Sequence, residues 1–343
     1  MRYKLLGKSG LRVSELALGT MTFGEEWGWG ASHEESRKIF DSYVEAGGNL
    51  IDTANNYTEG TSEKFVGEFI AAERDRFVVA TKYTQNNQQG DPNAAGNHRK
   101  NLVRSLEGSL QRLKTDYVDL LWIHAWDFMT PVEEVMRALD DLVRAGKVLY
   151  VGISDTPAWI VSQANILAEL RGWTPFVGLQ IRYSLVDRTA ERDLLPMARS
   201  LDLGVTIWSA LASGVLSGKY NQDAATVGRA NMSGRPINER NRTIAQAAVE
   251  VAQEVGCTPS QVALSWVRQQ KGVIIPIIGA RTLEQLRDNL GCLSCSLTPE
   301  QLARLNEASK FDVGFPHDFL GAGGIKKAVY GGLFDQIDNH RSG

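Results

Sequence analysis

The sequence predicts one (β/α)8 barrel with a small N-terminal β-hairpin, a long loop after the seventh strand and an extra C-terminal segment. Eight short apolar runs alternate with segments in which apolar residues recur at helical spacing. The runs are continuous rather than alternating, as expected of parallel strands that are buried on both faces. The competing fold, a doubly wound sheet, requires G-x-G-x-x-G after an early strand. The nearest match, at residues 28–33, lacks the third glycine and that position, so the barrel is the better prediction.

The predicted elements follow one another in a regular order. Residues 3–14, with turn residues at 8–10, form the hairpin. The eight strands are expected at 15–19, 49–52, 76–82, 117–123, 148–153, 176–180, 204–208 and 273–278. The helices after strands one to six and after strand eight are expected at 34–46, 62–72, 98–113, 131–145, from 157 onward, 190–202 and 282–290. Pro131 in a first turn and glycines 47 and 48 after a last turn support these ends, and two further helices are expected before strand eight.

Two segments fall outside this repeat. Residues 212–240 lack periodicity and are rich in Gly, Ser, Asn and Arg, and a loop of this length inside a compact domain is often a lid. Residues 311–343 are Gly-rich and irregular, so they either cover the mouth of the barrel or are disordered. Because barrels commonly reach this length as one unit, we expect a single domain over 1–343.

Composition narrows the partners and the compartment. The net charge of −3 indicates neither nucleic acid nor an anionic membrane surface as a partner. The N-terminus has no apolar run after its basic residues, and no stretch approaches the roughly 18 apolar residues of a membrane span. Three cysteines are too few for a disulfide framework, and Cys292 and Cys295 have no second pair nearby. We therefore expect a cytoplasmic protein without a metal site.

Four polar residues stand at or just beyond the ends of three successive strands: Asp52, Tyr57, Lys82 and His124. A free tyrosine, with a pKa near ~10, is a poor proton donor or acceptor at neutral pH, and a nearby cation lowers that pKa. Taken singly, a strand-end Asp–Lys pair is often structural, and a lone histidine is usually a satisfied polar group. Their common position at the ends of successive strands, where barrels carry their active sites, is nevertheless the best functional clue in the sequence.

The residues around these four positions resemble those of the aldo-keto reductases. The matching segments are Asp52-Thr53-Ala54 with Tyr57, Thr81-Lys82, Ile123-His124, Gly152-Ile153-Ser154 and Gly279-Ala280-Arg281-Thr282. The opening segment over 6–14 is similar to that of many members, including the β-subunits of voltage-gated potassium channels. The resemblance extends from about residue 3 to about residue 310. It is close to bacterial aldo/keto reductases of the aryl-alcohol dehydrogenase and potassium-channel β-subunit type. It implies the same barrel fold.

The resemblance also implies a catalytic tetrad. Tyr57 would donate a proton to a carbonyl oxygen while a hydride reaches the carbon. Lys82 would lower the pKa of Tyr57, and Asp52 would hold the ammonium group in place. His124 would orient the carbonyl by a hydrogen bond and help to stabilise developing negative charge.

The hydride requires a carrier, because none of these side chains can supply one. The resemblance implies that this carrier is a nicotinamide dinucleotide bound across the mouth of the barrel. The residues implied for this cofactor are Ser154, Asp155, Gln180, Trp208, Ser209, Leu211, Gly214, Lys219, Gly279, Arg281, Gln285 and Asn289. Asp155 stands where asparagine is commoner, and Trp208 matches the aromatic residue that stacks on the nicotinamide ring. We expect NADP(H) rather than NAD(H), because Arg281 at the start of a helix can pair bidentately with a phosphate.

Aromatic residues in the loops expected at the mouth bear on the substrate. Trp27, Trp29, Tyr83 and Trp126 would favour an apolar, aromatic carbonyl compound. Packing of the loops against one another explains the same residues equally well. The resulting hypothesis is an NADP-dependent reductase of aldehydes or ketones that also runs in reverse as an alcohol dehydrogenase. The alternative is an NADP(H)-binding regulatory subunit with incidental turnover, and a homo-oligomer stays open in both cases.

Overall fold

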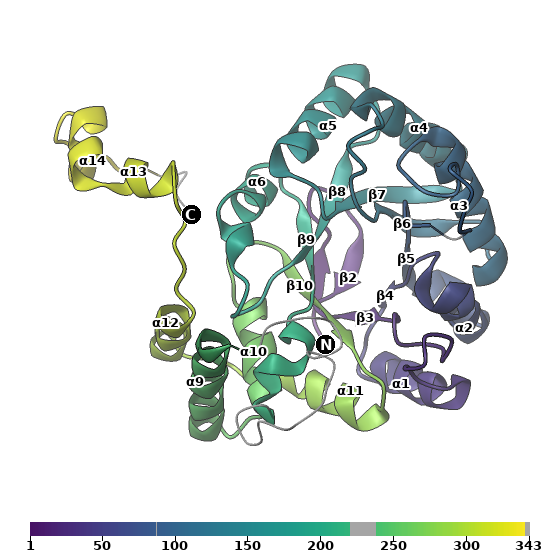
Figure 1. Cartoon of the computed structure of the whole chain (residues 1–343), viewed down its shortest axis with the longest axis horizontal. Helices are drawn as coiled ribbons and strands as arrows, with labels where there is room; N and C mark the ends of the chain where they lie inside the picture. The colour runs from purple at the N-terminus through teal and green to yellow at the C-terminus, as the bar shows by residue number, and fades with distance from the viewer. Residues whose placement is uncertain (87, 220–237, 340–343) are drawn as a thin grey trace.

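The computed structural model describes residues 1–86, 88–219 and 238–339. Eight parallel strands close into a barrel in the order β10-β3-β4-β5-β6-β7-β8-β9, and helices surround it (Figure 1). The strands are β3 (Ala17–Gly19), β4 (Leu50–Asp52), β5 (Val78–Tyr83), β6 (Val118–Ile123), β7 (Val148–Ser154), β8 (Phe176–Arg182), β9 (Gly204–Trp208) and β10 (Ile274–Gly279). Each strand lies within about two residues of its predicted range, and the barrel prediction is confirmed.

The helices also follow the predicted order. They are α1 (His33–Glu45), α2 (Thr61–Ile70), α3 (Arg99–Leu113), α4 (Val132–Arg144), α5 (Ala158–Arg171), α6 (Leu194–Ser200), α9 (Glu239–Val255), α10 (Pro259–Arg268), α11 (Leu283–Leu290) and α12 (Pro299–Ala308). Thr258 and Thr298 start α10 and α12 by accepting a backbone N–H three residues on, each with proline in the first turn. α6 is shorter than predicted, because the Asp193 side chain caps the helix at Leu194. Among the described residues, no helix is both long and apolar enough to cross a membrane.

The N-terminal hairpin closes the end of the barrel at which the strands begin. β1 (Tyr3–Leu5) and β2 (Arg12–Ser14) pair antiparallel, as predicted. Gly7 lies between them with φ +55°. A Cβ atom on Gly7 would lie 2.5 Å from the carbonyl oxygens of Val177 and Asp202, so only glycine allows this close approach.

Alternation along each strand divides the core into two layers. Ile51, Val79 and Ile123 belong to the larger cluster, which packs between the strands and the helices. Leu50 and Ala80, one position away on the same strands, belong to a separate cluster inside the barrel. Successive side chains on a strand point to opposite faces, so every second residue lines the barrel interior.

Trp122 on β6 fills the middle of the barrel and is 1% exposed. Gly152 and Gly178 face it from the next two strands. A Cβ atom on Gly152 would lie 2.3 Å from the Trp122 ring, and one on Gly178 would lie 2.8 Å from it. The two glycines therefore make room for one large side chain, which supports the layer of polar residues above it.

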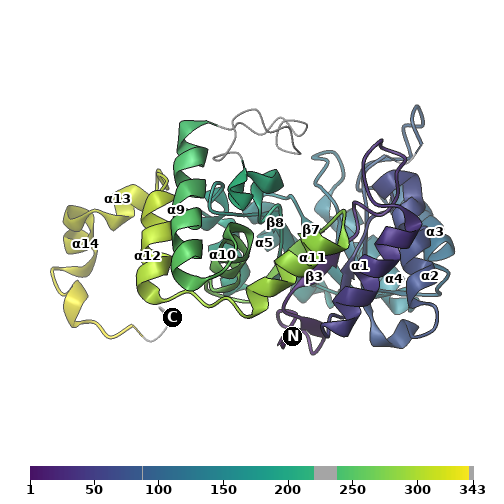
Figure 2. The same ribbon diagram turned by 90° about the horizontal axis from the view of Figure 1, so that it is seen from below.

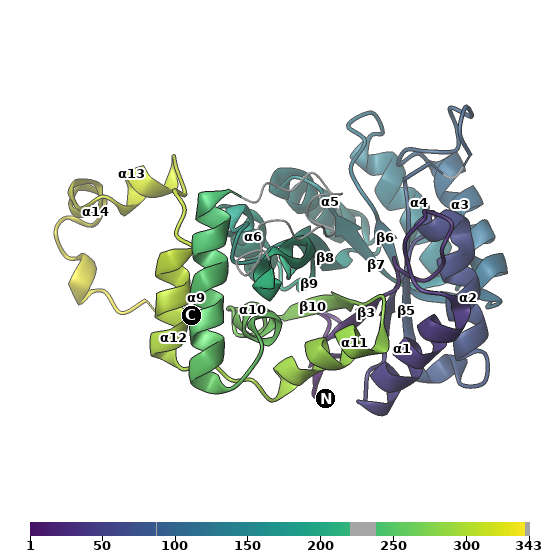
Figure 3. The same cartoon turned by 60° about the horizontal axis from the view of Figure 1, so that its bottom comes forward.

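The two segments outside the repeat differ in what the structure describes. The long loop expected over 212–240 begins with the 3-10 turn η4 (Ala212–Ser217), and residues 220–237 lie outside the described part of the chain. After α12, the tail forms α13 (His317–Gly321) and α14 (Gly323–Tyr330), and none of residues 311–339 is buried. In Figure 1 the two short helices lie outside the ring of helices, and in Figures 2 and 3 α9 and α12 stand between them and the barrel. The tail thus does not cover the mouth in this structure.

Candidate active site

The inward-facing positions become polar at the carboxyl ends of the strands. Two residues beyond the interior residues Leu50, Ala80 and Trp122 stand Asp52, Lys82 and His124. On the next two strands, Ser154 and Gln180 pair in register. The closed barrel thereby brings side chains as far apart in the chain as Asp52 and Gln180 into hydrogen-bond contact.

Lys82 and Asp52 form a buried ion pair at the centre of this polar layer. The Lys82 side chain is fully buried and that of Asp52 is 6% exposed. Lys82 Nζ donates to Asp52 Oδ1 and, at 2.7 Å, to the carbonyl oxygen of Thr53. Gln180 Nε2 donates to the other carboxylate oxygen at 2.9 Å. Burial alone would lower the pKa of Lys82, but Asp52 and Tyr57 raise it above its ordinary value, so Lys82 is a cation at neutral pH.

Tyr57 opens the short turn η1 (Tyr57–Gly60) in the loop after β4. Its ring centroid lies 4.8 Å from Lys82 Nζ and 5.9 Å from the centroid of the His124 ring. Burial raises the pKa of Tyr57, and the Lys82 cation opposes that rise. The resemblance implied that Lys82 lowers the pKa of Tyr57. In the structure Lys82 only limits a rise that burial causes, and the pKa of Tyr57 stays above its ordinary value. The hydroxyl group is protonated at neutral pH, which a proton donor requires.

His124 lies just past β6 and is 9% exposed. Burial, together with the nearby Lys82 cation, lowers the pKa of His124 to about 3. The imidazole is therefore neutral throughout the physiological pH range. Its Nδ1 atom has no hydrogen-bond partner among the described residues. A neutral imidazole can donate one hydrogen bond to a substrate oxygen without transferring a charge.

Backbone strain concentrates in the loops around this site. Ten non-glycine residues of the described chain have positive φ, and all except Lys114 and Asp202 follow the end of a barrel strand. Six of the ten adjoin predicted site residues or are site residues themselves: Thr58, Thr84, Asp155, Ser209, Ala212 and Ser213. Such conformations cost about 1–3 kcal/mol each and cluster at functional sites.

Comparison with known proteins decides the family. Residues 15–310 match the aldo/keto reductase family. The chain belongs to this family. It is 41% identical over 327 residues to the norsolorinic acid reductase of Aspergillus flavus, an alignment that covers 92% of this chain and 83% of that protein. It is 39% identical over 346 positions to the aryl-alcohol dehydrogenase [NADP(+)] of Phanerodontia chrysosporium, with 94% and 89% covered. A putative aryl-alcohol dehydrogenase of Saccharomyces cerevisiae is 38% identical over 337 positions, with 93% and 90% covered. The predicted family is confirmed, and the chain is an oxidoreductase.

Two buried residues of this aldo/keto reductase carry side-chain polar atoms that no described protein group satisfies. Within the described chain, the Ser154 hydroxyl and both polar side-chain atoms of Asn55 have no hydrogen-bond partner. An unpaired buried polar group costs about 1–3 kcal/mol, so each is expected to gain a partner when the mouth is filled. Ser154 stands where the cofactor carboxamide was predicted. Asn55, whose backbone N–H donates to the Lys82 carbonyl oxygen at 3.2 Å, was not predicted. Neither the residue type nor the spacing of Asn55 in the sequence indicates a binding role, and only the burial of its unpaired side chain in the structure does so.

Asp155 and Trp208 meet at the mouth, where β7 and β9 end. Trp208 Nε1 donates to Asp155 Oδ1 at 3.1 Å. The Arg182 guanidinium lies 5.7 Å from the centroid of the Trp208 ring. This contact joins the ends of β7 and β9 and determines the orientation of the indole ring.

The residues predicted to bind the phosphates lie at the start of α11 and along η4. Arg281 is exposed and its backbone N–H donates to Gln285 Oε1 at 2.9 Å. Asn289 is buried, and its side-chain nitrogen donates to the Gly279 carbonyl oxygen at 3.3 Å, so it ties α11 to β10. One backbone N–H group in the first turn of α11 already has a protein partner, because Leu283 N–H donates to Glu35 Oε1 at 2.7 Å.

The loop after β9 makes a compact turn. Ser209 has φ +60°, and the Leu211 carbonyl oxygen accepts the Gly214 N–H at 2.9 Å. A Cβ atom on Gly214 would lie 3.5 Å from Lys219 Nζ, so Lys219 folds back over this turn. The turn thus carries a cation next to the predicted cofactor site.

The aromatic residues predicted for the substrate pocket divide into two groups. The ring centroid of Trp27 lies 6.4 Å from that of Tyr57, edge to face, and 5.8 Å from that of Trp29. Trp126 is half-buried and packs against the core. Tyr83 is 1% exposed and donates its hydroxyl to the Asn97 carbonyl oxygen at 3.2 Å. Because Tyr83 follows the inward-facing Lys82 on β5, it faces outward into the core, and its prediction as a pocket residue is wrong.

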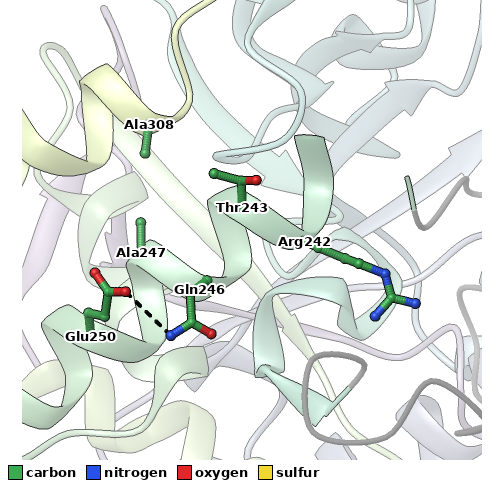
Figure 4. A pocket seen from close by; sticks show the side chains of 6 residues that line it. All are labelled: Arg242, Thr243, Gln246, Ala247, Glu250 and Ala308. Carbon is green, nitrogen blue, oxygen red and sulfur yellow. Dashed lines mark hydrogen bonds between the residues drawn. The ribbon is translucent and has the colours of Figure 1, made fainter. Parts of the chain in front are cut away.

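Two surface hollows lie away from the tetrad. One, of about 460 Å³, lies along α9 next to α12 (Figure 4). It is lined by Arg242, Thr243, Gln246, Ala247, Glu250 and Ala308. The other, of about 410 Å³, lies between α6 and the start of β10. Neither contains a tetrad residue, so the candidate site is defined by the tetrad at the mouth.

Proposed function

We propose that this aldo/keto reductase uses NADPH to reduce an apolar, aromatic aldehyde or ketone to the alcohol. The observation that carries the proposal is the buried Lys82 cation, which is held by Asp52 and lies against the ring of a protonated Tyr57. When bound, the dinucleotide supplies the hydride. Ser154, with its unpaired hydroxyl, and Trp208, with its ring held by Asp155, would hold the nicotinamide end.

The tetrad residues account for the proton. Tyr57 gives its hydroxyl proton to the carbonyl oxygen and becomes a phenolate next to the Lys82 ammonium group, which stabilises the new anion. Neutral His124 donates a hydrogen bond to the same oxygen and orients the carbonyl group. In the reverse direction, the phenolate accepts the proton of the alcohol.

The choice of cofactor and substrate class has separate support. Exposed Arg281 at the start of α11 can pair with the 2′-phosphate that distinguishes NADP(H) from NAD(H). The relative from Phanerodontia chrysosporium carries NADP(+) and aryl alcohol in its name. Trp27, edge to face with Tyr57, offers an aromatic surface next to the proton donor.

The test is the rate of NADPH oxidation with 4-nitrobenzaldehyde for the wild type and Tyr57→Phe. Loss of the proton donor should lower kcat by about 10²–10⁴, while the NADPH Kd, measured by quenching of tryptophan fluorescence, stays within about threefold. Tyr83→Phe is the matched control, because it removes a tyrosine hydroxyl one residue from Lys82 that faces outward. It should leave kcat unchanged.

Two outcomes would contradict the proposal. If Tyr57→Phe retains wild-type turnover, Tyr57 is not the proton donor. If the wild type binds NADPH but reduces no aldehyde or ketone in a panel of aromatic and aliphatic compounds, the regulatory alternative replaces the reductase.

A further inference from the structure

Asp155 is a carboxylate at the mouth that the proton chemistry does not use. It follows directly after β7 with φ +41°, a left-handed conformation that aspartate tolerates better than most residues. Its backbone N–H donates to the Gln180 carbonyl oxygen at 3.3 Å, and its side chain accepts the Trp208 indole N–H at 3.1 Å. These two contacts hold the carboxylate over the mouth, at the same end as the tetrad.

The two cations near Asp155 are each paired with another carboxylate. Lys82 is paired with Asp52, and Arg182 is paired with Asp187 at 2.6 Å. Asp155 itself accepts a hydrogen bond from a neutral indole. Its negative charge is therefore only partly compensated by protein groups, and it acts on whatever enters the mouth.

Asp155 is close enough to the reacting groups to act on them electrostatically. The Asp155 side chain is exposed at the mouth. The loss of water on its protein side still raises the pKa of Asp155, and the Trp208 hydrogen bond and the Arg182 and Lys82 cations oppose that rise. In turn, the Asp155 charge is among the causes that raise the pKa of Tyr57. Hydride and proton reach adjacent atoms of one carbonyl group, so the ring that donates the hydride must lie next to Tyr57. That ring is thus within range of Asp155.

We propose that the Asp155 carboxylate makes the site prefer the oxidised dinucleotide, whose nicotinamide ring carries a positive charge, over the neutral reduced ring. The inference rests on the proposed function and adds a residue that sets the balance between the two redox forms. A unit charge several ångströms from another in a partly buried site changes an equilibrium by about tenfold or more. Asp155 therefore favours hydride transfer from bound NADPH and slows release of NADP+.

The experiment measures the Kd of NADP+ and of NADPH by isothermal titration calorimetry for the full-length wild type and Asp155→Asn. The asparagine amide oxygen can still accept the Trp208 N–H, so the variant removes the charge while it keeps the shape and the hydrogen bond. We expect the ratio Kd(NADP+)/Kd(NADPH) to rise about tenfold, which corresponds to about 30 mV in the potential of the bound couple. Asp91→Asn is the matched control, because Asp91 lies in a loop at the same end and pairs with the exposed Arg104. It should leave the ratio unchanged.

The outcomes separate this inference from the proposed function. If both nucleotides bind and the ratio in Asp155→Asn stays within twofold of the wild type, the charge has no such role, and the proposed cofactor use stands. If both affinities fall equally, Asp155 acts only by positioning Trp208, and the inference is also overturned. If the wild type binds neither nucleotide, the proposed function is wrong and the inference falls with it.

Discussion

Replacing Asp52 with asparagine tests the buried pair on which the site depends. Lys82 is fully buried, and removal of one partner of such a pair typically costs about 3–5 kcal/mol because the other charge is left unpaired. The protein can avoid a buried, unpaired charge only if Lys82 loses its proton. For a lysine with an ordinary pKa of 10.5, losing the proton at about pH 7 costs about 5 kcal/mol. We therefore expect Asp52→Asn to lower the free energy of unfolding by about 3–5 kcal/mol.

The same reasoning predicts a pH dependence with a definite sign. In the wild type the folded-state pKa of Lys82 is raised, so the contribution of the pair is fully present below pH 10.5 and is lost only as the pH rises through the higher folded value. In the variant, burial is the largest remaining influence and lowers the folded pKa. The unfolded chain then binds more protons, and stability rises with pH. At about pH 9.5 removing the proton from Lys82 costs only about 1.4 kcal/mol. The difference in unfolding free energy between the wild type and Asp52→Asn should therefore narrow to about 1–2 kcal/mol.

The assay is urea denaturation followed by far-ultraviolet circular dichroism, since urea is uncharged and does not screen ion pairs. The double variant Asp52→Asn/Lys82→Met removes both charges and should be more stable than Asp52→Asn by at least about 2 kcal/mol. The control is Asp141→Asn, which breaks pairs with the exposed Arg99 and Arg137 and should cost less than about 1 kcal/mol. A deficit below about 1 kcal/mol for Asp52→Asn, or a double variant no more stable than the single one, would refute the reasoning.

Three further predictions concern the cofactor, the core and the tail. Arg281→Ala should weaken NADPH binding by about 10–100-fold and change NADH binding less than twofold, as measured by calorimetry, because a charge-assisted bond to phosphate is worth about 1.5–3 kcal/mol. Arg287→Ala on the same helix is the control, and equal losses for both nucleotides would contradict the prediction. Gly152→Ala should destabilise the fold by about 1–3 kcal/mol through its contact with Trp122, and adding Trp122→Phe should restore part of that loss in urea melts. Removal of residues 315–343 should change the unfolding free energy by less than about 0.5 kcal/mol, since no described residue of that segment is buried, and a larger loss would reveal packing on the barrel.

Much of the site could be predicted from the sequence, because the periodicity of each strand and the order of the strands can both be read along the chain. Inward-facing positions recur at every second residue, and parallel strands all end at one rim. Asp52, Lys82 and His124 therefore had to meet once eight strands were recognised. The outward direction of Tyr83 followed from the same alternation, since it is the neighbour of Lys82. Its aromatic character favours a pocket residue, but its position on the strand directs it into the core.

Other features depended on the tertiary structure. The bond between Trp208 and Asp155 joins residues 53 positions apart, and it depends on strand register and on the left-handed backbone at Asp155. The unpaired state of Asn55 is a property of its surroundings, which no local pattern encodes. The tail carries exposed apolar side chains such as Phe315, Phe319 and Leu333. Sequence showed that these residues are apolar, but where they lie is decided by three-dimensional packing, because periodicity describes which face of an element is apolar and not what that face meets.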